Sequence, residues 1–328
     1  MSLSGIKLAL EESLPGSFIY VFTDASAKDY NLSRSVQDLI QTKQSQVIFV
    51  LTGDCGNMIS IDYRVYHDIA RASTGMVIHV EKSEVQQVLN TVRETIKGDK
   101  TVRTSIETPA NQFTEVTFEI DDYTDYATVS VYGKHVELRI LDGPSAKRFP
   151  LLWTKHTKIV NLVDPTPGTY KCLVRGTIPS TVIVVGRSDI SFKHGFSSSQ
   201  AQSLNDTTLQ PDAYAKSFLS VLVKNSKTLV DIVNVQILDM NEHPIYEPLP
   251  VKKIAGNFYT TTKPFEVPPY MFKLQINGID TSTQKNIRRI SKIPVSPKVP
   301  EYCMIPTHGT SSEKVPLILT ANNEWPDL

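Results

Sequence analysis

The chain has 328 residues, and its 34 lysines and arginines balance its 34 aspartates and glutamates, so the formal net charge is zero. Because nucleic-acid binding depends on clustered cations that displace counterions, this balance argues against a nucleic-acid partner. No apolar run reaches the roughly 18–20 residues of a membrane span, and no secretory signal opens the sequence as given. The length suits two or three domains of about 100–150 residues each.

The first hundred residues alternate between helical and strand patterns. Residues 18–22 and 47–51 are continuous apolar runs, as expected of parallel strands that are covered on both faces. Between them Leu32, Val36 and Ile40 fall on one face of a helix. The alternation predicts a parallel sheet. The remaining expected elements are a helix over 5–13, a helix over 62–73 with Gly75 as its C′ residue, a strand over 76–80, and a helix that opens on a capping box from Ser83 to Gln86.

Acidic residues follow the strands of this expected sheet. Asp24 comes directly after the first strand, and Asp54 follows the second. Ligands of open parallel sheets bind at the carboxyl ends of the strands, so these two carboxylates lie where chemistry is expected. Asp54 and Asp29, which lies in the same loop as Asp24, are weaker candidates than Asp24.

After residue 98 the apolar pattern changes to a period of two. Short alternating strands separated by turn signals predict an antiparallel β-sandwich over residues 99–196. A serine-rich stretch over 197–213 is interpreted as a linker. Residues 214–300 carry a second set of strands, typical of an immunoglobulin- or fibronectin-like sandwich, and the tail over 301–328 is expected to be disordered.

Three segments of the first hundred residues resemble a known family. FIYVFTDASAKDY, QVIFVLTGDC and VYHDIARASTGMVIHVEKSEVQQVL are similar to the second half of a von Willebrand factor A domain, of the kind that begins the hemicentins. The resemblance continues through DPTPGTYKCLVRG, SDISFKHGFS and INGIDTSTQKNIRRISKIPVSPKVP to about residue 300. It implies an α/β plus all-β protein: a partial doubly wound parallel sheet over 1–98, which is a truncated von Willebrand A fold, followed by two antiparallel β-sandwich domains.

The resemblance also implies a metal site. In the family, three loops hold a divalent cation, usually Mg²⁺, through Asp-x-Ser-x-Ser, a threonine and a further aspartate. Asp24 matches that last aspartate, whereas the first two loops have no counterpart in the sequence as given. Since Mg²⁺ demands several oxygen ligands, we expect an incomplete site and no cofactor unless upstream loops are supplied. The role that we favour for Asp24 is that of a turn or cap residue at the end of a strand.

The truncation has a structural consequence. The family's sheet places its first strand beside the strand over 18–22, and without that neighbour a flat apolar edge is exposed. Either a partner supplies the missing half or the sequence is a fragment of a longer protein, and the second explanation is the simpler one.

Signatures of enzymes are missing from the sequence, which has no G-x-S-x-G, H-E-x-x-H, C-x-x-C or phosphate-binding glycine loop. We therefore expect a non-enzymatic protein. The alternative, a hydrolase or nucleotide-binding enzyme, has only Thr23, Asp24, Ser26 and Asp54 at its disposal. We expect ordinary surface or core roles for His135, His156 and His194, a core position for Trp153 and Tyr170, and free or buried thiols for Cys55, Cys172 and Cys303.

The leading functional hypothesis is an extracellular matrix and cell-adhesion module that resembles hemicentin. It would act through contacts with matrix or cell-surface proteins. An intracellular interaction protein of von Willebrand A type is the other non-enzymatic hypothesis. Two sequons, at Asn205 and Asn31, are glycosylation candidates in a secreted protein. Asn205 lies in the expected linker and is the stronger of the two, because Asn31 stands at a helix start where it can act as a cap.

Overall fold

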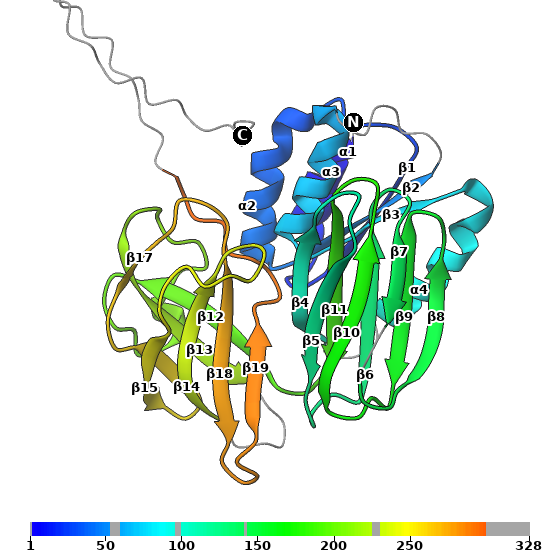
Figure 1. The fold of residues 1–328 in the computed structure, drawn as a ribbon. Coiled ribbons are helices and arrows are strands. Elements are labelled where there is room, and N and C mark those ends of the chain that lie inside the picture. The colour runs from blue at the N-terminus through cyan, green and yellow to red at the C-terminus, as the bar shows by residue number, and fades with distance from the viewer. Residues whose placement is uncertain (1, 53–59, 96–99, 141–142, 225–229, 300–328) are drawn as a thin grey trace, which may run out of the picture.

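A computed structural model describes residues 2–52, 60–95, 100–140, 143–224 and 230–299 of the chain. It shows an α/β unit that lies across one face of a first β-domain, with a second β-domain beside it (Figure 1). Asp54, Cys55 and Cys303 lie outside the described residues.

The α/β unit is built on a parallel sheet. Its strands run in the order β1-β2-β3, and both pairings are parallel, as the alternation of helix and strand predicted. In chain order the elements are α1 (Ser2–Glu12), β1 (Phe18–Thr23), α2 (Ser33–Lys43), β2 (Gln46–Thr52), α3 (Ile61–Ala72), β3 (Val77–Val80) and α4 (Val85–Thr95).

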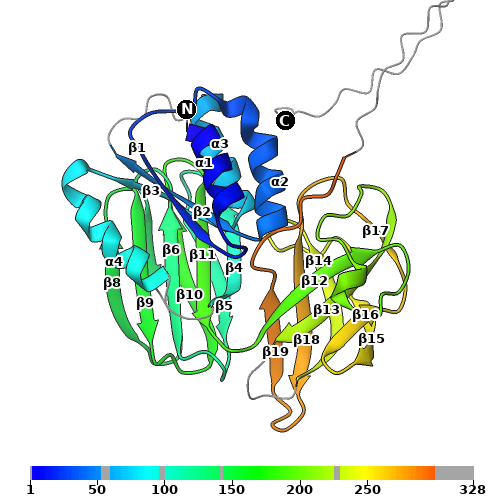
Figure 2. The same cartoon turned by 180° about the vertical axis from the view of Figure 1, so that it is seen from behind.

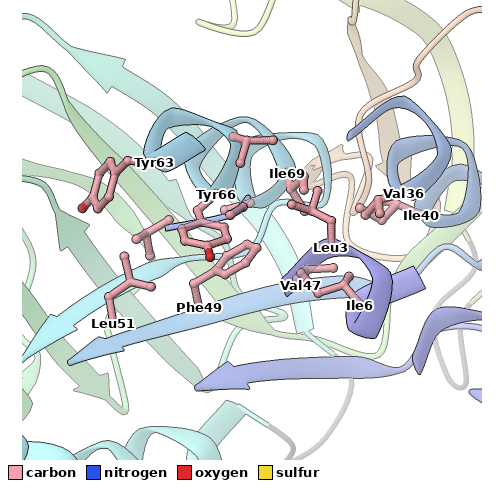
Figure 3. Packing of buried hydrophobic residues seen from close by; sticks show 14 of the residues in the cluster. Leu3, Ile6, Val36, Ile40, Val47, Phe49, Leu51, Tyr63, Tyr66 and Ile69 are labelled. Carbon is pink, nitrogen blue, oxygen red and sulfur yellow. The ribbon is translucent and has the colours of Figure 1, made fainter. Parts of the chain in front are cut away.

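One face of this sheet is covered by α1, α2 and α3. Figure 3 shows Leu3 and Ile6 of α1 and Ile69 of α3 against Val47 and Phe49 of β2, all of them buried. Here the apolar residues on one face of each helix pack against alternate residues of the strand. This contact explains both the helical spacing of the apolar residues in the helices and the apolar residues on this face of β2.

The opposite face lies on the first β-domain rather than on a further layer of helices. Ile48 and Val50 of β2 share a buried cluster with Val88 of α4, and with Leu152 and Ile159 of the β-domain. Figure 2 shows α4 beside strands β8 and β9 on this side. Strand β2 is therefore buried on both faces, which accounts for its continuous apolar run.

The first β-domain consists of two sheets with a shared core. The larger has the order β4-β11-β6-β9-β8, the smaller β5-β10-β7, and apolar residues of both form one buried cluster between them. The strands are β4 (Lys100–Thr108), β5 (Thr114–Ile120), β6 (Tyr126–Tyr132), β7 (Glu137–Ile140), β8 (Lys147–Trp153), β9 (Thr157–Val163), β10 (Gly168–Arg175) and β11 (Ser180–Arg187).

The second β-domain begins earlier than the sequence indicated. Strand β12 falls within 99–196 but pairs with β13, so it belongs to the second domain. The strands are β12 (Ser191–Ser197), β13 (Lys216–Lys224), β14 (Val230–Leu238), β15 (Leu249–Ala255), β16 (Phe258–Thr261), β17 (Phe265–Glu266), β18 (Lys273–Asp280) and β19 (Asn286–Ile290).

Residues 197–213, which were interpreted as a linker, are instead a folded connection inside the second β-domain. Ala201 and Ala213 are buried, and Phe196 and Thr208 exchange two backbone hydrogen bonds of 2.8 Å. The serine-rich composition misled the prediction because backbone hydrogen bonds, rather than apolar side chains, hold this segment in place.

The two β-domains share one continuous sheet. Val102 of β4 pairs with Ile290 of β19, and this contact joins the strands of both domains into a 13-stranded antiparallel sheet within the described part of the chain. Arg103, Arg289 and Lys273 are buried at the same junction, and their carboxylate partners are largely buried. Asp121 accepts hydrogen bonds from Arg103 at 2.9 Å and from Arg289. Close by, Lys273 lies 3.5 Å from Glu242.

Two predicted helix boundaries and one core residue were wrong. Glu84, rather than Gln86, closes the hydrogen-bonded box before α4, by accepting from the backbone N–H of Glu81 at 2.9 Å. At the end of α3 the left-handed residue is Thr74, with φ of 49°. Gly75 is required for another reason, since a Cβ there would lie 1.8 Å from the carbonyl oxygen of Val47. Trp153 is 52% exposed because it ends the edge strand β8.

Candidate contact and metal site at the end of strand β1

Asp24 lies in the loop that follows β1, and its side chain is exposed. No hydrogen bond or ion pair joins its carboxylate to another residue of the described ranges. The neighbouring Thr23 hydroxyl is occupied, because it accepts the backbone N–H of Ala25 at 3.2 Å. Asp24 is thus a free carboxylate at the carboxyl end of a strand.

Ser26, two residues further, is tied to helix α3. Its hydroxyl donates to the carboxylate of Asp62, and this hydrogen bond lowers the pKa of Asp62. The loop is fixed further by Tyr66, whose hydroxyl donates to the carbonyl of Ala25 at 2.9 Å. A carboxylate with a lowered pKa is a weak general base, so Ser26 is poorly activated as a nucleophile.

Asp29 caps helix α1 across a long stretch of sequence. Its carboxylate accepts the backbone N–H groups of Leu3 at 3.2 Å and Ser4 at 2.9 Å. Burial raises the pKa of Asp29, but the hydrogen bonds from Ser4 and Leu3 outweigh it and bring the pKa to about 2. These bonds satisfy two of the free donors of a helix N-terminus. Sequence reasoning missed this role because cap and helix are 25 residues apart.

These contacts leave one carboxylate for a cation. Asp29 and Asp62 are engaged by hydrogen bonds, and Asp54 lies outside the described residues. Within the ranges that the structure describes, no three histidine, cysteine, aspartate or glutamate side chains are grouped so as to hold a metal ion. Because Mg²⁺ takes near-octahedral oxygen coordination, the described residues around Asp24 do not fit a complete site.

Histidines gather where the α/β unit meets the first β-domain. The ring of His79 lies 5.6 Å from that of His156, which lies 5.2 Å from the ring of His135. On the other side Tyr63 shares a 2.8 Å hydrogen bond with His79 Nε2, and its ring lies 5.4 Å from that of His67. No spacing along the chain indicates this cluster, so the sequence predicted ordinary surface or core roles for His135 and His156.

The edge of β1 is open in the described part of the chain. This strand pairs with β2 on one side, and its last aromatic residue, Phe22, is 51% exposed. The strand contains no charge, proline or bulge. At the far end of the large sheet, strand β8 carries Lys147, Arg148 and Pro150, and its register shifts after that proline.

Residues 1–82 match the family model described as the von Willebrand factor A domain. This match, together with the parallel sheet and its helices, defines a protein of von Willebrand A type at the N-terminal end. The further comparisons extend over nearly the whole chain and confirm the resemblance to the hemicentins. Hemicentin-1 of Homo sapiens is 33% identical over 331 aligned residues, which cover 96% of this chain and 6% of that protein.

Two further relatives agree. Hemicentin-2 of Mus musculus is 31% identical over 324 residues, covering 94% of this chain and 6% of its own length. The von Willebrand factor A domain-containing protein 7 of Mus musculus is 28% identical over 222 residues, covering 60% of this chain and 24% of its own length. The chain is thus a homologue of the hemicentins and spans 6% of the hemicentins that it matches. Among the described helices, none has the length and apolar character to cross a membrane.

Proposed function

We propose that the chain is a non-enzymatic module of an extracellular matrix protein, and that it acts through protein contacts made along the edge of β1. The likeness to the hemicentins supports the matrix assignment. The α/β unit is inferred to be the second half of a von Willebrand A fold, and each β-domain to be a sandwich.

The observation that carries this proposal is the difference between the two sheet edges. Folded proteins protect exposed edges with charges, proline or bulges, because an open edge pairs with other chains. Strand β8 has all three forms of protection, whereas β1 has none. An apolar strand at the edge of a sheet is the surface that strand addition uses. The edge of β1 therefore fits a partner that supplies a further strand.

Asp24 gives this surface a second element. It stands one residue beyond β1, so a strand paired with that edge would bring its own loop toward the carboxylate. A cation there would need oxygen ligands from the partner, since Asp24 supplies one. Asn205 and Asn31 are both exposed, and we propose them as glycan acceptors in that order.

A matched pair of variants tests the contact surface. Phe22→Lys places a charge on the open edge, and Phe149→Lys places one on β8, where the original side chain is 52% exposed. We expect Phe22→Lys to abolish most of the binding of purified chain to decellularised extracellular matrix, and Phe149→Lys to leave it unchanged. Equal behaviour of the two variants would reject the β1 surface.

The metal and enzyme assignments have their own measurements. Calorimetric titration with Mg²⁺ should show no tight one-to-one binding to the isolated chain, and assays with ester and phosphate substrates should show no turnover. Tight binding, or turnover lost in Asp24→Ala, would overturn the proposal.

A further inference from the structure

A cleft of about 410 Å³ lies between the two β-domains. Its lining comes from β4 and β5 of the first domain and from β14, β18 and β19 of the second, the two groups of strands that face each other across the junction in Figure 1. Small-molecule sites in proteins occupy about 300–1,000 Å³ and occur often between domains, so this cleft has the size of a ligand site. Neither the α/β unit nor the edge of β1 contributes to it.

A chain of side-chain hydrogen bonds orders the second-domain wall of the cleft. Arg288 Nε donates to Gln275 at 2.6 Å, Gln275 donates to Asn277 at 2.8 Å, and Asn277 donates to Asn234 at 2.7 Å. Each amide in the chain is thereby fixed in orientation, and successive hydrogen bonds polarise one another. The chain ends at the amide NH₂ of Asn234, which donates to no other described residue.

Two more polar side chains line the cleft without a partner in the described part of the protein. Glu119 of β5 offers a carboxylate, and Asn286 of β19 offers both a donor and an acceptor. With Asn234, three strands from two domains thus turn unpaired hydrogen-bonding groups toward one space. A hydroxyl group both donates and accepts, so a ligand rich in hydroxyls matches this mixture of groups.

The charges of the cleft favour a neutral ligand. Arg103 and Arg288 are balanced by Glu119 and Asp121. Arg103 is already paired with Asp121 at 2.9 Å, and Arg288 lies 3.7 Å from Glu242. A sulfated or otherwise strongly anionic ligand would find no surplus of cations and would meet the free carboxylate of Glu119.

A backbone irregularity shapes the apolar side of the cleft. The register between β14 and β18 shifts at Val233, which is left as an extra residue and is 51% exposed. Opposite lies Gly278, where a Cβ would come within 2.8 Å of the carbonyl oxygen of Asp231. Bulges recur next to functional sites, where they redirect a side chain. Here the bulge directs the aliphatic side chain of Val233 toward a cleft that is otherwise polar. Such a side chain suits contact with the C–H face of a sugar ring.

We propose that this cleft is a binding site for a neutral saccharide, with Asn234, Asn286 and Glu119 bonding its hydroxyl groups and Val233 contacting its ring. The ligand touches both β-domains, so its binding also stabilises their contact. The inference is independent of the β1 surface.

The test is calorimetric titration of the full chain with neutral oligosaccharides that contain mannose, galactose or N-acetylglucosamine, and with a heparin-derived sulfated oligosaccharide. We expect one neutral probe to bind, and Asn234→Ala and Asn286→Ala each to weaken it about tenfold, as for a lost hydrogen bond. Asn90→Ala is the matched control, because it removes an exposed asparagine of the α/β unit and should change nothing. Val233→Phe, a change at an exposed position that fills the cleft, should abolish binding without affecting folding.

The outcomes that overturn the proposal are distinct. The first is that no neutral probe binds up to about 10 mM, a concentration at which association is weaker than about 3 kcal/mol. The second is that the sulfated probe alone binds. The third is that the Asn234 and Asn286 variants keep their affinity. A glycopeptide and its released oligosaccharide should bind equally, since the sugar is the ligand; binding of the glycopeptide alone would also contradict it.

Discussion

The two interfaces of the first β-domain are built from opposite chemistry. Toward the α/β unit it offers buried apolar residues, among them Leu152 and Ile159. Toward the second β-domain it offers Arg103 and Asp121, which meet the fully buried Arg289. Apolar contact is non-directional, whereas a buried carboxylate shared by two guanidinium groups requires one geometry. The difference indicates that apolar area holds the α/β unit, while the ionic junction fixes how the β-domains are oriented.

The ionic junction should give the largest effect. Asp121→Ala leaves Arg103 and Arg289 buried without their carboxylate, and we expect a loss of about 3–5 kcal/mol in the free energy of unfolding. Urea unfolding measures this. The control is Asp122→Ala, at an exposed ion pair with Lys285, with an expected loss below about 1 kcal/mol. Similar losses in the two variants would remove the distinction between the interfaces.

The apolar interface should respond to a cavity. Ile159 is fully buried between the two units, and Ile159→Ala should cost about 2–4 kcal/mol. Ile61→Ala, at a position that is 62% exposed, serves as the control and should stay within about 0.5 kcal/mol. If Ile159→Ala proves as mild as its control in urea unfolding, the α/β unit is held by something other than this contact.

The two interfaces should respond differently to acid. Burial, with the charges of His79 and Arg64, lowers the pKa of His67 to about 4. The neutral form is therefore favoured in the folded state, and stability is lost as the pH falls from about 6.5, the unfolded value, to about 4. We expect a loss of about 2 kcal/mol over this window. Burial raises the pKa of Asp121, but Arg103 and Arg289 outweigh it and hold the pKa below its ordinary value, so the ionic junction stays charged.

The measurement is unfolding stability as a function of pH. His67→Gln should reduce the slope of the profile between pH 6.5 and 4, and part of the slope should remain because burial also lowers the pKa of His194 to about 4. The exposed His243→Gln should leave the whole slope in place. A profile that is unchanged in His67→Gln would assign the acid sensitivity to other groups.

The cap of helix α1 by Asp29 lies inside the α/β unit, so its loss gives a reference for the stability changes expected at the two interfaces. Asp29→Ala removes the cap of α1 and should cost about 1 kcal/mol. Since the pKa of Asp29 is about 2, its contribution is complete above about pH 4 and is lost as the pH falls toward 2. The measurement is hydrogen exchange, which should become faster in the first turn of α1 of the Asp29→Ala variant. If exchange becomes faster in other elements rather than in α1, the role of Asp29 is not local.

The sequence predicted the elements better than their contacts. The runs over 18–22 and 47–51 correctly indicated parallel strands. Burial on both faces explains the apolar run of β2, whereas β1 is partly exposed along its length. Tyr170 is fully buried as predicted. Trp153 was misjudged, although Lys147, Arg148 and Pro150 in the same run are residues typical of an edge strand.

The stacking of the α/β unit on the first β-domain had no sequence signal. Thr128 and Ser130 of β6 alternate with valines and so indicate a solvent-facing side, yet they are 7% and 4% exposed because the α/β unit covers them. The site shows the same limit. Asp24 was located by its place after a strand, whereas the cap by Asp29, the histidine cluster and the amide chain from Arg288 to Asn234 depend on residues that are distant along the chain.

The pairing of Val102 with Ile290 has a mechanical consequence. A hinge between the β-domains would have to break the shared sheet and separate Arg289 from Asp121 at the same time. Tension applied across the described part of the molecule is therefore carried by one stiff body, with its units at fixed angles, rather than absorbed by a flexible joint.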